Sequence, residues 1–156
     1  MLVTNHVLSG AGIGAAVRRP VPALAIGVAS HFVLDSLPHW GKWESDRRFL
    51  CVAVADGLTG LAAMGVITRA VMRSPAADRT KVAASVVLGM AGAALPDLDK
   101  PAHIIFKRRL WPDVVNRFHG RIQDEAPNRF VSHELVAAAG FAVSAAALIK
   151  WRGVRG

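Results

Sequence analysis

The chain has 156 residues, of which 53% are hydrophobic and 19% charged, and its formal net charge is +8. This length allows one domain with a substantial core but excludes two independent ones. The low charged fraction and the mean hydropathy of +0.35 are unusual for a soluble enzyme and indicate a membrane-associated or deeply buried helical protein. Because the basic residues are scattered among loops instead of forming one run, no specific nucleic-acid binding is expected.

In chain order, hydrophobic periodicity and helix breakers predict an all-α compact bundle of about six helices, in a single domain over residues 1–156. The predicted helices cover residues 4–17, 21–37, 49–72, 81–95 and 128–151, with short helical pieces near residues 101–110 and 111–120. Residues 96–132 form a more polar, irregular region. No segment shows the alternating pattern of a convincing strand.

Two of the predicted helices bear on membrane insertion. Residues 49–72 are long and apolar enough to span a bilayer, whereas the apolar part of the last helix, residues 135–149, falls just short. The loop charges show no asymmetry that would determine a topology. We therefore expect a bundle that sits in or on a membrane, with basic residues beside the apolar helices contacting lipid head groups.

The segment SGAGIGAA at residues 9–16 is rich in glycine. Its spacing differs from G-x-G-x-x-G, and no strand precedes it, so it lacks the context of a dinucleotide-binding loop. Small residues at this spacing favour close packing of one helix against another.

Ionisable side chains recur within or beside the apolar helices. A lone buried carboxylate is unfavourable unless it is paired, hydrogen-bonded or bound to a metal. His31 and Asp35 project from one helix face at i, i+4 spacing, and Asp97 and Asp99 stand two apart at a helix end. Such a combination of histidine and aspartate is the ligand set of zinc, manganese or iron. The candidate metal ligands are His6, His31, Asp35, Asp56, Asp97, Asp99, His119 and His133.

Each candidate also has a purely structural interpretation. A single helical histidine is more often a core or surface residue than a ligand, and PDLD is a common helix C-terminal turn. Asp56 could pair with Arg69. His39 continues the spacing of the second helix, but Pro38 redirects it, and His103 is a candidate for a residue that faces only solvent or a head group.

The motif SHFVLDSLPH at residues 30–39 resembles the SHFxxDxxQPLH helix of the zinc-dependent phospholipase C and P1 nuclease superfamily. In that helix, H-x-x-x-D supplies ligands to a multi-zinc site. Nearly the whole chain also resembles small bacterial membrane-bound metal-dependent hydrolases of the YdjM type, in which an N-terminal histidine, a buried aspartate, an LPDxDHP-like turn and later histidines recur. The matching positions are His6, His31 with Asp35, Asp56, residues 95–101 (LPDLDKP), His119 and His133.

The chain departs from these patterns at three places. His39 follows Asp35 by four residues where the nuclease pattern has six, and the second H-x-x-x-D of that superfamily is absent. Lys100 stands where the hydrolase turn has a histidine. One or two divalent ions, zinc before manganese or iron, are therefore expected instead of three.

The resemblance implies a hydrolase of the bacterial cytoplasmic membrane that uses a metal-activated water against a phosphoester, either lipid or nucleotide-like. The expected partners are membrane lipid and an anionic or phosphoester substrate. Candidates for the general base, or for a residue that orients a ligand, are Asp99, Glu134 and Asp56. Arginines that could neutralise a phosphate are Arg108, Arg109, Arg121 and Arg129.

Two non-enzymatic functions fit the same residues. The buried histidines and aspartates could form a structural metal site or a polar network in a small membrane protein. They could also belong to an ion pathway, because ionisable residues inside membranes often line one.

Overall fold

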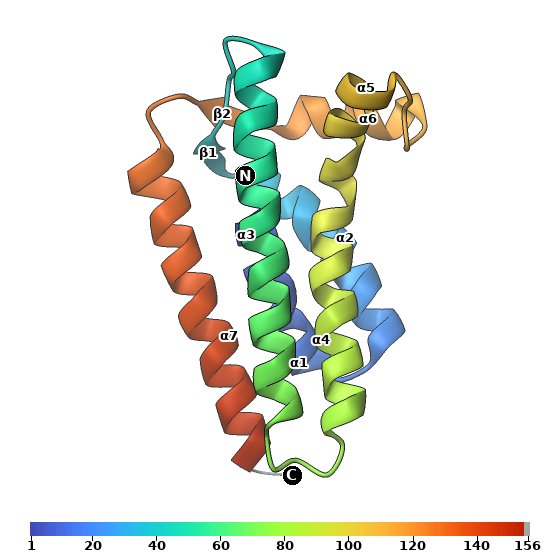
Figure 1. The fold of residues 1–156 in the computed structure, drawn as a ribbon, viewed down its shortest axis with the longest axis vertical. Coiled ribbons are helices and arrows are strands. Elements are labelled where there is room, and N and C mark those ends of the chain that lie inside the picture. The colour runs from blue at the N-terminus through green and yellow to red at the C-terminus, as the bar shows by residue number, and fades with distance from the viewer. Residues whose placement is uncertain (155–156) are drawn as a thin grey trace.

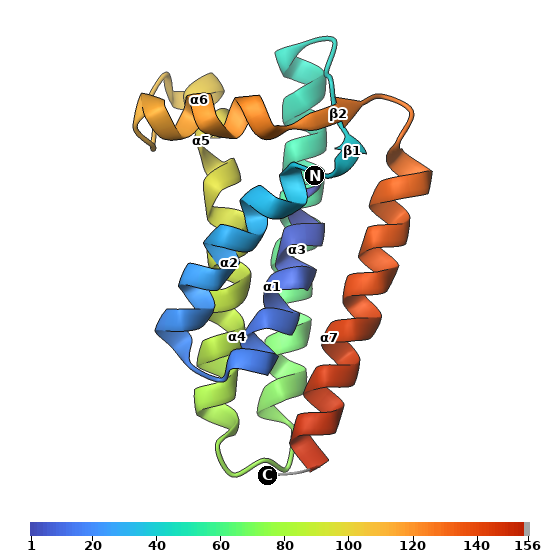
Figure 2. The same cartoon turned by 180° about the vertical axis from the view of Figure 1, so that it is seen from behind.

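The computed structural model describes residues 1–154, with side chains to residue 151, and it confirms the predicted all-α bundle (Figure 1). The long helices that build the bundle are α1 (Val3–Val17), α2 (Pro20–Asp35), α3 (Asp46–Met72), α4 (Arg79–Ala94) and α7 (Val136–Val154). Two shorter helices lie at the end opposite the α3–α4 turn: α5 (Asp99–Phe106) and α6 (Asp113–Ile122). Helix α6 runs across the bundle axis in both views and covers this end (Figure 2).

Helix α1 is central and contacts α2, α3, α4 and α7. The glycine-rich segment has the packing role predicted for it: a Cβ atom on Gly10 or Gly14 would overlap the backbone of Gly89 or Val86 in α4. The hydroxyl of Ser85 donates to the Gly14 carbonyl at 2.9 Å, which is possible only because the two backbones approach so closely. The buried residues around this contact include Val7, Ala11, Val86 and Met90.

Helix boundaries differ from the predicted ones where capping or strand pairing intervenes. Helix α3 begins at Asp46, three residues before the predicted start, because the Ser45 hydroxyl accepts a hydrogen bond from the Arg48 amide at 3.3 Å. Helix α2 ends at Asp35. The chain then enters strand β1 (Pro38–Trp40), which pairs in parallel with β2 (Asp124–Ala126).

No strand was predicted here because three-residue segments are too short to show an alternating pattern. The pairing places His39 beside Glu125 and joins the end of α2 to the chain that follows α6. Two other irregular elements bracket this region: the 3₁₀ turn η1 (Leu95–Leu98) and the π-helical turn η2 (Phe130–Leu135). Such elements occur often at functional sites.

Three helical segments are long and apolar enough to cross a membrane, by length and composition: Asp46–Met72, Arg79–Phe106 and Phe130–Trp151. The first agrees with the predicted span. The last was expected to fall just short, with an apolar run over residues 135–149, but η2 and α7 together form a continuous helical stretch that is long enough. The middle one continues through the proline at which the predicted helix stopped. Large apolar side chains on the outer face of α3, such as Leu61 and Val66, are more than 60% exposed, as expected for helices that contact lipid.

Candidate metal centre

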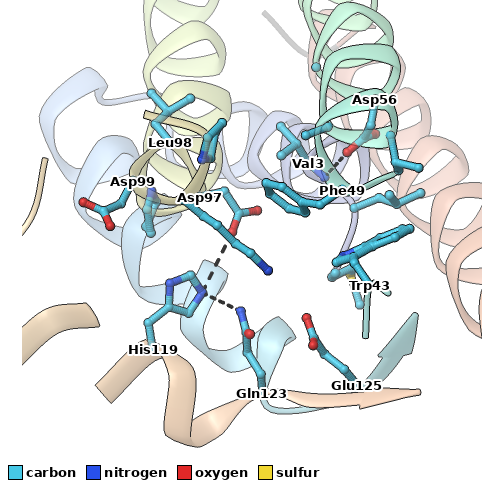
Figure 3. A pocket seen from close by; sticks show the side chains of 18 of the residues that line it. Val3, Trp43, Phe49, Asp56, Asp97, Leu98, Asp99, His119, Gln123 and Glu125 are labelled. Atoms are coloured by element: carbon cyan, nitrogen blue, oxygen red, sulfur yellow. Dashed lines mark hydrogen bonds and ion pairs between the residues drawn. The ribbon is translucent and has the colours of Figure 1, made fainter. Parts of the chain in front are cut away.

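Four side chains from three elements meet at the α6 end of the bundle. His31 and Asp35 come from α2, Asp97 from η1 and His119 from α6, and one potential ligand atom of each lies within 4.8 Å of the others. Figure 3 shows His119 and Asp97 facing each other at the edge of a pocket. We call these four residues the metal group. The i, i+4 spacing in α2 indeed directs both of its members to one point, with His31 Nε2 3.4 Å from Asp35 Oδ2.

The distances within the metal group are those of atoms arranged around a common centre. His119 Nε2 lies 2.8 Å from Asp35 Oδ2 and 3.0 Å from His31 Nε2. Asp97 Oδ1 is 3.7 Å from His31 Nε2 and 3.9 Å from His119 Nε2. Ligand atoms of a tetrahedral zinc site are about 3.3 Å apart. The group could therefore hold a divalent ion after small side-chain adjustments.

A backbone contact orients His31 for this role. Its Nδ1 lies 2.8 Å from the Ala93 carbonyl oxygen, an acceptor, so Nδ1 carries the proton and donates it. Nε2 is then the ring atom directed at Asp35 and His119, and once it has lost its proton its lone pair is available to an ion. A backbone carbonyl that accepts from the other ring nitrogen is a usual partner of a metal-binding histidine.

His6, also predicted as a ligand, lies beside the metal group and faces the other oxygen of each carboxylate. Its Nε2 is 3.0 Å from Asp35 Oδ1 and 3.9 Å from Asp97 Oδ2, and its ring stacks on His31 with centroids 4.1 Å apart. The Met1 amino group donates to the same Asp35 Oδ1 at 2.7 Å. Each aspartate thus has one oxygen toward His6 and the other toward the metal group.

Burial and charge set the protonation states around Asp35. Burial alone would raise the pKa of Asp35, but hydrogen bonds from His119, His31 and His6 outweigh it and hold that pKa far below its usual range. Burial lowers the pKa of His6. At His31, burial is outweighed by Asp35 and Asp97, so the pKa is raised. The Asp35 carboxylate is thus stabilised by histidine donors and by the Met1 amino group, and a divalent cation that binds here would displace histidine protons.

Asp56, predicted as a ligand or base, instead caps a helix. Its carboxylate accepts a hydrogen bond from the Val3 amide at 2.5 Å (Figure 3). It also accepts from the Thr4 amide at 3.1 Å and the Thr4 hydroxyl at 2.5 Å. Helix α1 has no side-chain cap of its own, so Asp56 of α3 supplies the acceptor that its first amides need. The structure does not include this carboxylate in the metal group.

Asp99, the second aspartate of PDLD, also points away from the metal group. It is 3% exposed and accepts from Arg109 Nη1 at 2.7 Å, the Leu110 amide at 2.6 Å and the Trp111 amide at 3.1 Å. These bonds fasten the loop between α5 and α6. Asp97 in the 3₁₀ turn and Asp99 at the start of α5 face different partners, so only Asp97 joins the metal group.

Glu134, predicted as a general base, is a buried structural acceptor. It is 1% exposed and accepts from Asn5 Nδ2 at 2.6 Å, the Trp40 amide at 3.0 Å and the Leu2 amide at 3.1 Å. Its oxygens thereby join α1, β1 and η2. No oxygen of Glu134 is directed at the metal group among the contacts of the described residues.

The remaining histidines also lie outside the metal group. His133, a predicted ligand, shares a hydrogen bond of 2.8 Å with Ser132 near the surface. His39 is fully buried; its Nδ1 is 2.8 Å from the Leu37 carbonyl, and its Nε2 makes no hydrogen bond within the described residues. The Nδ1 of His103 is likewise buried without a partner there.

Gln123 and Glu125 are site residues that the sequence analysis did not select. Gln123 Nε2 is 3.1 Å from His119 Nε2 and 3.3 Å from Asp35 Oδ2. Gln123 stands four residues after His119 on α6, the position of the aspartate in an H-x-x-x-D motif, so spacing alone could have identified it. Glu125 follows two residues after Gln123, in strand β2, where the alternation of an extended chain turns its side chain to the same side. The sequence analysis missed Glu125 because it did not predict this strand.

A cavity of about 420 Å³ adjoins the metal group and includes Asp97 and His119 in its wall (Figure 3). Its walls come from the first turns of α3, from η1 and α5, from α6 and from the paired strands. The apolar residues that line it include Trp40, Trp43, Phe49, Val52 and Leu98. The polar ones include Lys100, Arg109, Asn116, Gln123 and Glu125.

Comparison with family models, with curated proteins and with solved structures gives no match. The function is therefore argued from the geometry of the metal group and its cavity.

Proposed function

We propose that this protein is a membrane-associated, metal-dependent hydrolase that cleaves a phosphoester. The observation that carries the proposal is the group of His31, Asp35, Asp97 and His119, two of which, Asp97 and His119, line a cavity large enough for a small head group. If these four side chains only compensated one another's charges inside the core, no cavity would be needed beside them. Three helices that are long and apolar enough to cross a membrane support the membrane association.

The metal group would hold the first ion, and its two histidines with two carboxylates suit zinc, with manganese or iron as alternatives. When bound, a divalent ion polarises a phosphoryl oxygen and lowers the pKa of a water at its open position. His6, with the second oxygens of Asp35 and Asp97, offers ligands for a second ion. We propose one or two ions on this basis.

The chain's own residues would orient the reactants and move the proton. Ala93 holds the tautomer of His31, and Gln123 donates to the Asp35 carboxylate. We propose Glu125 as the proton acceptor. Its carboxylate lines the cavity: Oε2 accepts from the Lys42 amide at 3.3 Å, and Oε1 lies 3.9 Å from the fully buried His39 Nε2. In Asp56, Asp99 and Glu134, by contrast, both carboxylate oxygens accept hydrogen bonds.

Metal analysis and hydrolysis assays on the detergent-purified protein test the proposal. We expect about one or two equivalents of zinc or manganese, lost in His31→Ala and Asp35→Ala, and a matching loss of bis(p-nitrophenyl) phosphate hydrolysis. His133→Ala is the matched control because this histidine lies outside the metal group. A structural metal site would instead unfold the chain on chelation without any turnover to lose. A chain that binds no ion, and whose two variants fold unchanged, contradicts the proposal.

A further inference from the structure

The cavity beside the metal group contains one cation that no carboxylate neutralises within the described residues. Lys100 lies in the first turn of α5 and is exposed, and its Nζ lies 4.3 Å from the centre of the Phe49 ring in α3. Lys100 forms no ion pair there, although Asp99 precedes it. The other lining cation, Arg109, is held by Asp99 at 2.7 Å. Lys100 is therefore the ammonium that remains available to a bound anion.

The position of Lys100 suits an anion that also reaches the metal group. Lys100 and Asp97 line the same cavity and are separated by only two residues of the chain. With Asp35 and Asp97 on a bound cation, Lys100 supplies a further positive charge in the same cavity. A phosphate can then contact the ion with one oxygen and the ammonium with another, which is a charge-assisted contact.

The neighbouring wall is aromatic and apolar. The Trp40 and Trp43 rings pack edge to face with centroids 4.6 Å apart, and the Trp43 and Phe49 centroids are 6.3 Å apart. Val52 lines the cavity one turn further along α3. Beyond it, the outer face of α3 is apolar, and this helix is one of the candidate membrane spans. An apolar chain that leaves the cavity along α3 would stay out of water.

We propose that this cavity binds an anionic amphiphile, a phosphate group that carries an apolar chain, with Lys100 as its anion-binding residue and the Trp43–Phe49 wall as the seat of the adjoining chain. The inference rests on the proposed function for the contact between the phosphate and the metal group. The positive charge of Lys100 and the aromatic wall belong to the chain itself. Their effects can therefore be measured whether or not the protein hydrolyses anything.

Isothermal titration of the full-length purified protein tests this inference. The probes are inorganic phosphate, methylphosphonate and butylphosphonate, whose carbon–phosphorus bonds resist hydrolysis. We expect butylphosphonate to bind at least tenfold more tightly than methylphosphonate, since each buried methylene contributes about fourfold in affinity. Lys100→Gln should weaken all three probes by about tenfold or more. The matched control is Lys81→Gln, at the opposite end of the bundle.

Trp43→Ala separates the two parts of the proposed site, because Trp43 belongs to the apolar wall whereas the ring that contacts Lys100 is that of Phe49. It should reduce the preference for butylphosphonate over methylphosphonate while leaving the affinity for inorganic phosphate within about twofold. Equal affinities for all three probes would indicate a free-phosphate site and overturn the amphiphile. A Lys100→Gln loss no larger than that of Lys81→Gln, or no binding at all, would overturn the role of Lys100. Absence of bound metal would refute the proposed function, and the lysine and chain-length comparisons on the same protein would still decide this inference.

Discussion

At the residue scale, the centre of the candidate site is Asp35, whose two oxygens serve different partners. Oδ2 faces His119 and His31, and Oδ1 faces His6. Several donors around one buried carboxylate explain why it stays ionised without an arginine partner. The same residues that stabilise this charge are those that could bind a cation, so protons and metal ions should compete for the site.

The pH dependence of metal affinity follows from the pKa of His31. That pKa is raised, so in the metal-free protein a proton still occupies the site above the ordinary histidine range, and an entering ion must displace it. Zinc affinity should therefore fall as the pH decreases from 8 to 6, with a slope that approaches about tenfold per unit, for each proton displaced, once the pH is below the pKa of the histidine. Competition titrations with a zinc chelator at pH 6, 7 and 8 measure this. An affinity that does not change across this range contradicts the assignment of His31.

Glu125→Gln tests the proposed proton acceptor. The variant keeps the size and hydrogen bonds of the side chain but cannot take up a proton, so the turnover rate should fall by about 10²- to 10⁴-fold. The bound metal should be unchanged, because Glu125 lies outside the metal group. Glu44→Gln, at an exposed glutamate, is the control. Loss of metal together with activity would instead make Glu125 a ligand.

At the scale of elements, backbone amides without a local acceptor explain why carboxylates predicted as ligands or bases lie outside the metal group. The first amides of α1 have no local acceptor, and Asp56 and Glu134 reach them from α3 and η2. Asp99 serves the amides of the α5–α6 loop in the same way. A buried carboxylate can be stabilised by backbone amides as well as by a metal ion, and sequence spacing does not distinguish these two environments.

Asp56→Ala should therefore act on stability and leave the metal unaffected. Removing the cap of α1 should lower the free energy of unfolding by about 1–2 kcal/mol. Chemical or thermal unfolding in detergent measures the loss, and elemental analysis should show unchanged metal content. Asp113→Ala, at the first turn of α6, is a comparison with an acidic residue for which the described structure shows no hydrogen bond. Metal loss in Asp56→Ala at native stability would restore this residue as a ligand.

At the scale of the whole molecule, the metal group and its cavity lie at one end of a bundle whose outer helices are apolar. Helices α3 and α7 pack sparsely and leave large apolar side chains on their outer faces, among them Leu58, Leu61 and Val143. Exposing such apolar faces to water along a whole long helix would be energetically unfavourable. The arrangement suits a protein that keeps its site at the edge of a bilayer.

The protein should therefore remain in the membrane fraction after washes with high salt and alkaline carbonate, and should need detergent for extraction. Salt removes proteins held only by charge, whereas burial of the α3 and α7 faces in lipid is insensitive to it. Fractionation followed by immunoblotting measures this. Recovery of monodisperse protein from the soluble fraction without detergent would show that these faces are covered in another way.

Local spacing explains how far prediction from the sequence could reach. The helices of the bundle were predictable because apolar periodicity and prolines act within a few turns, and the His31–Asp35 pair because four residues make about one turn. The strand pair that sets His39 beside Glu125 was not, since residues some 85 positions apart had to meet. Three-residue strands carry no periodicity of their own.

The sequence by itself determined that this protein is an apolar helical bundle and that histidines and carboxylates gather near its helix ends. Only the tertiary structure decided which of them share a site. Asp97 and His119 join His31 and Asp35 because η1 and α6 fold over the end of α2. The other three carboxylates, Asp56, Asp99 and Glu134, instead accept hydrogen bonds from backbone amides. The physical reason is that a carboxylate is stabilised by the donors nearest to it in space, and only the folded chain decides which donors those are.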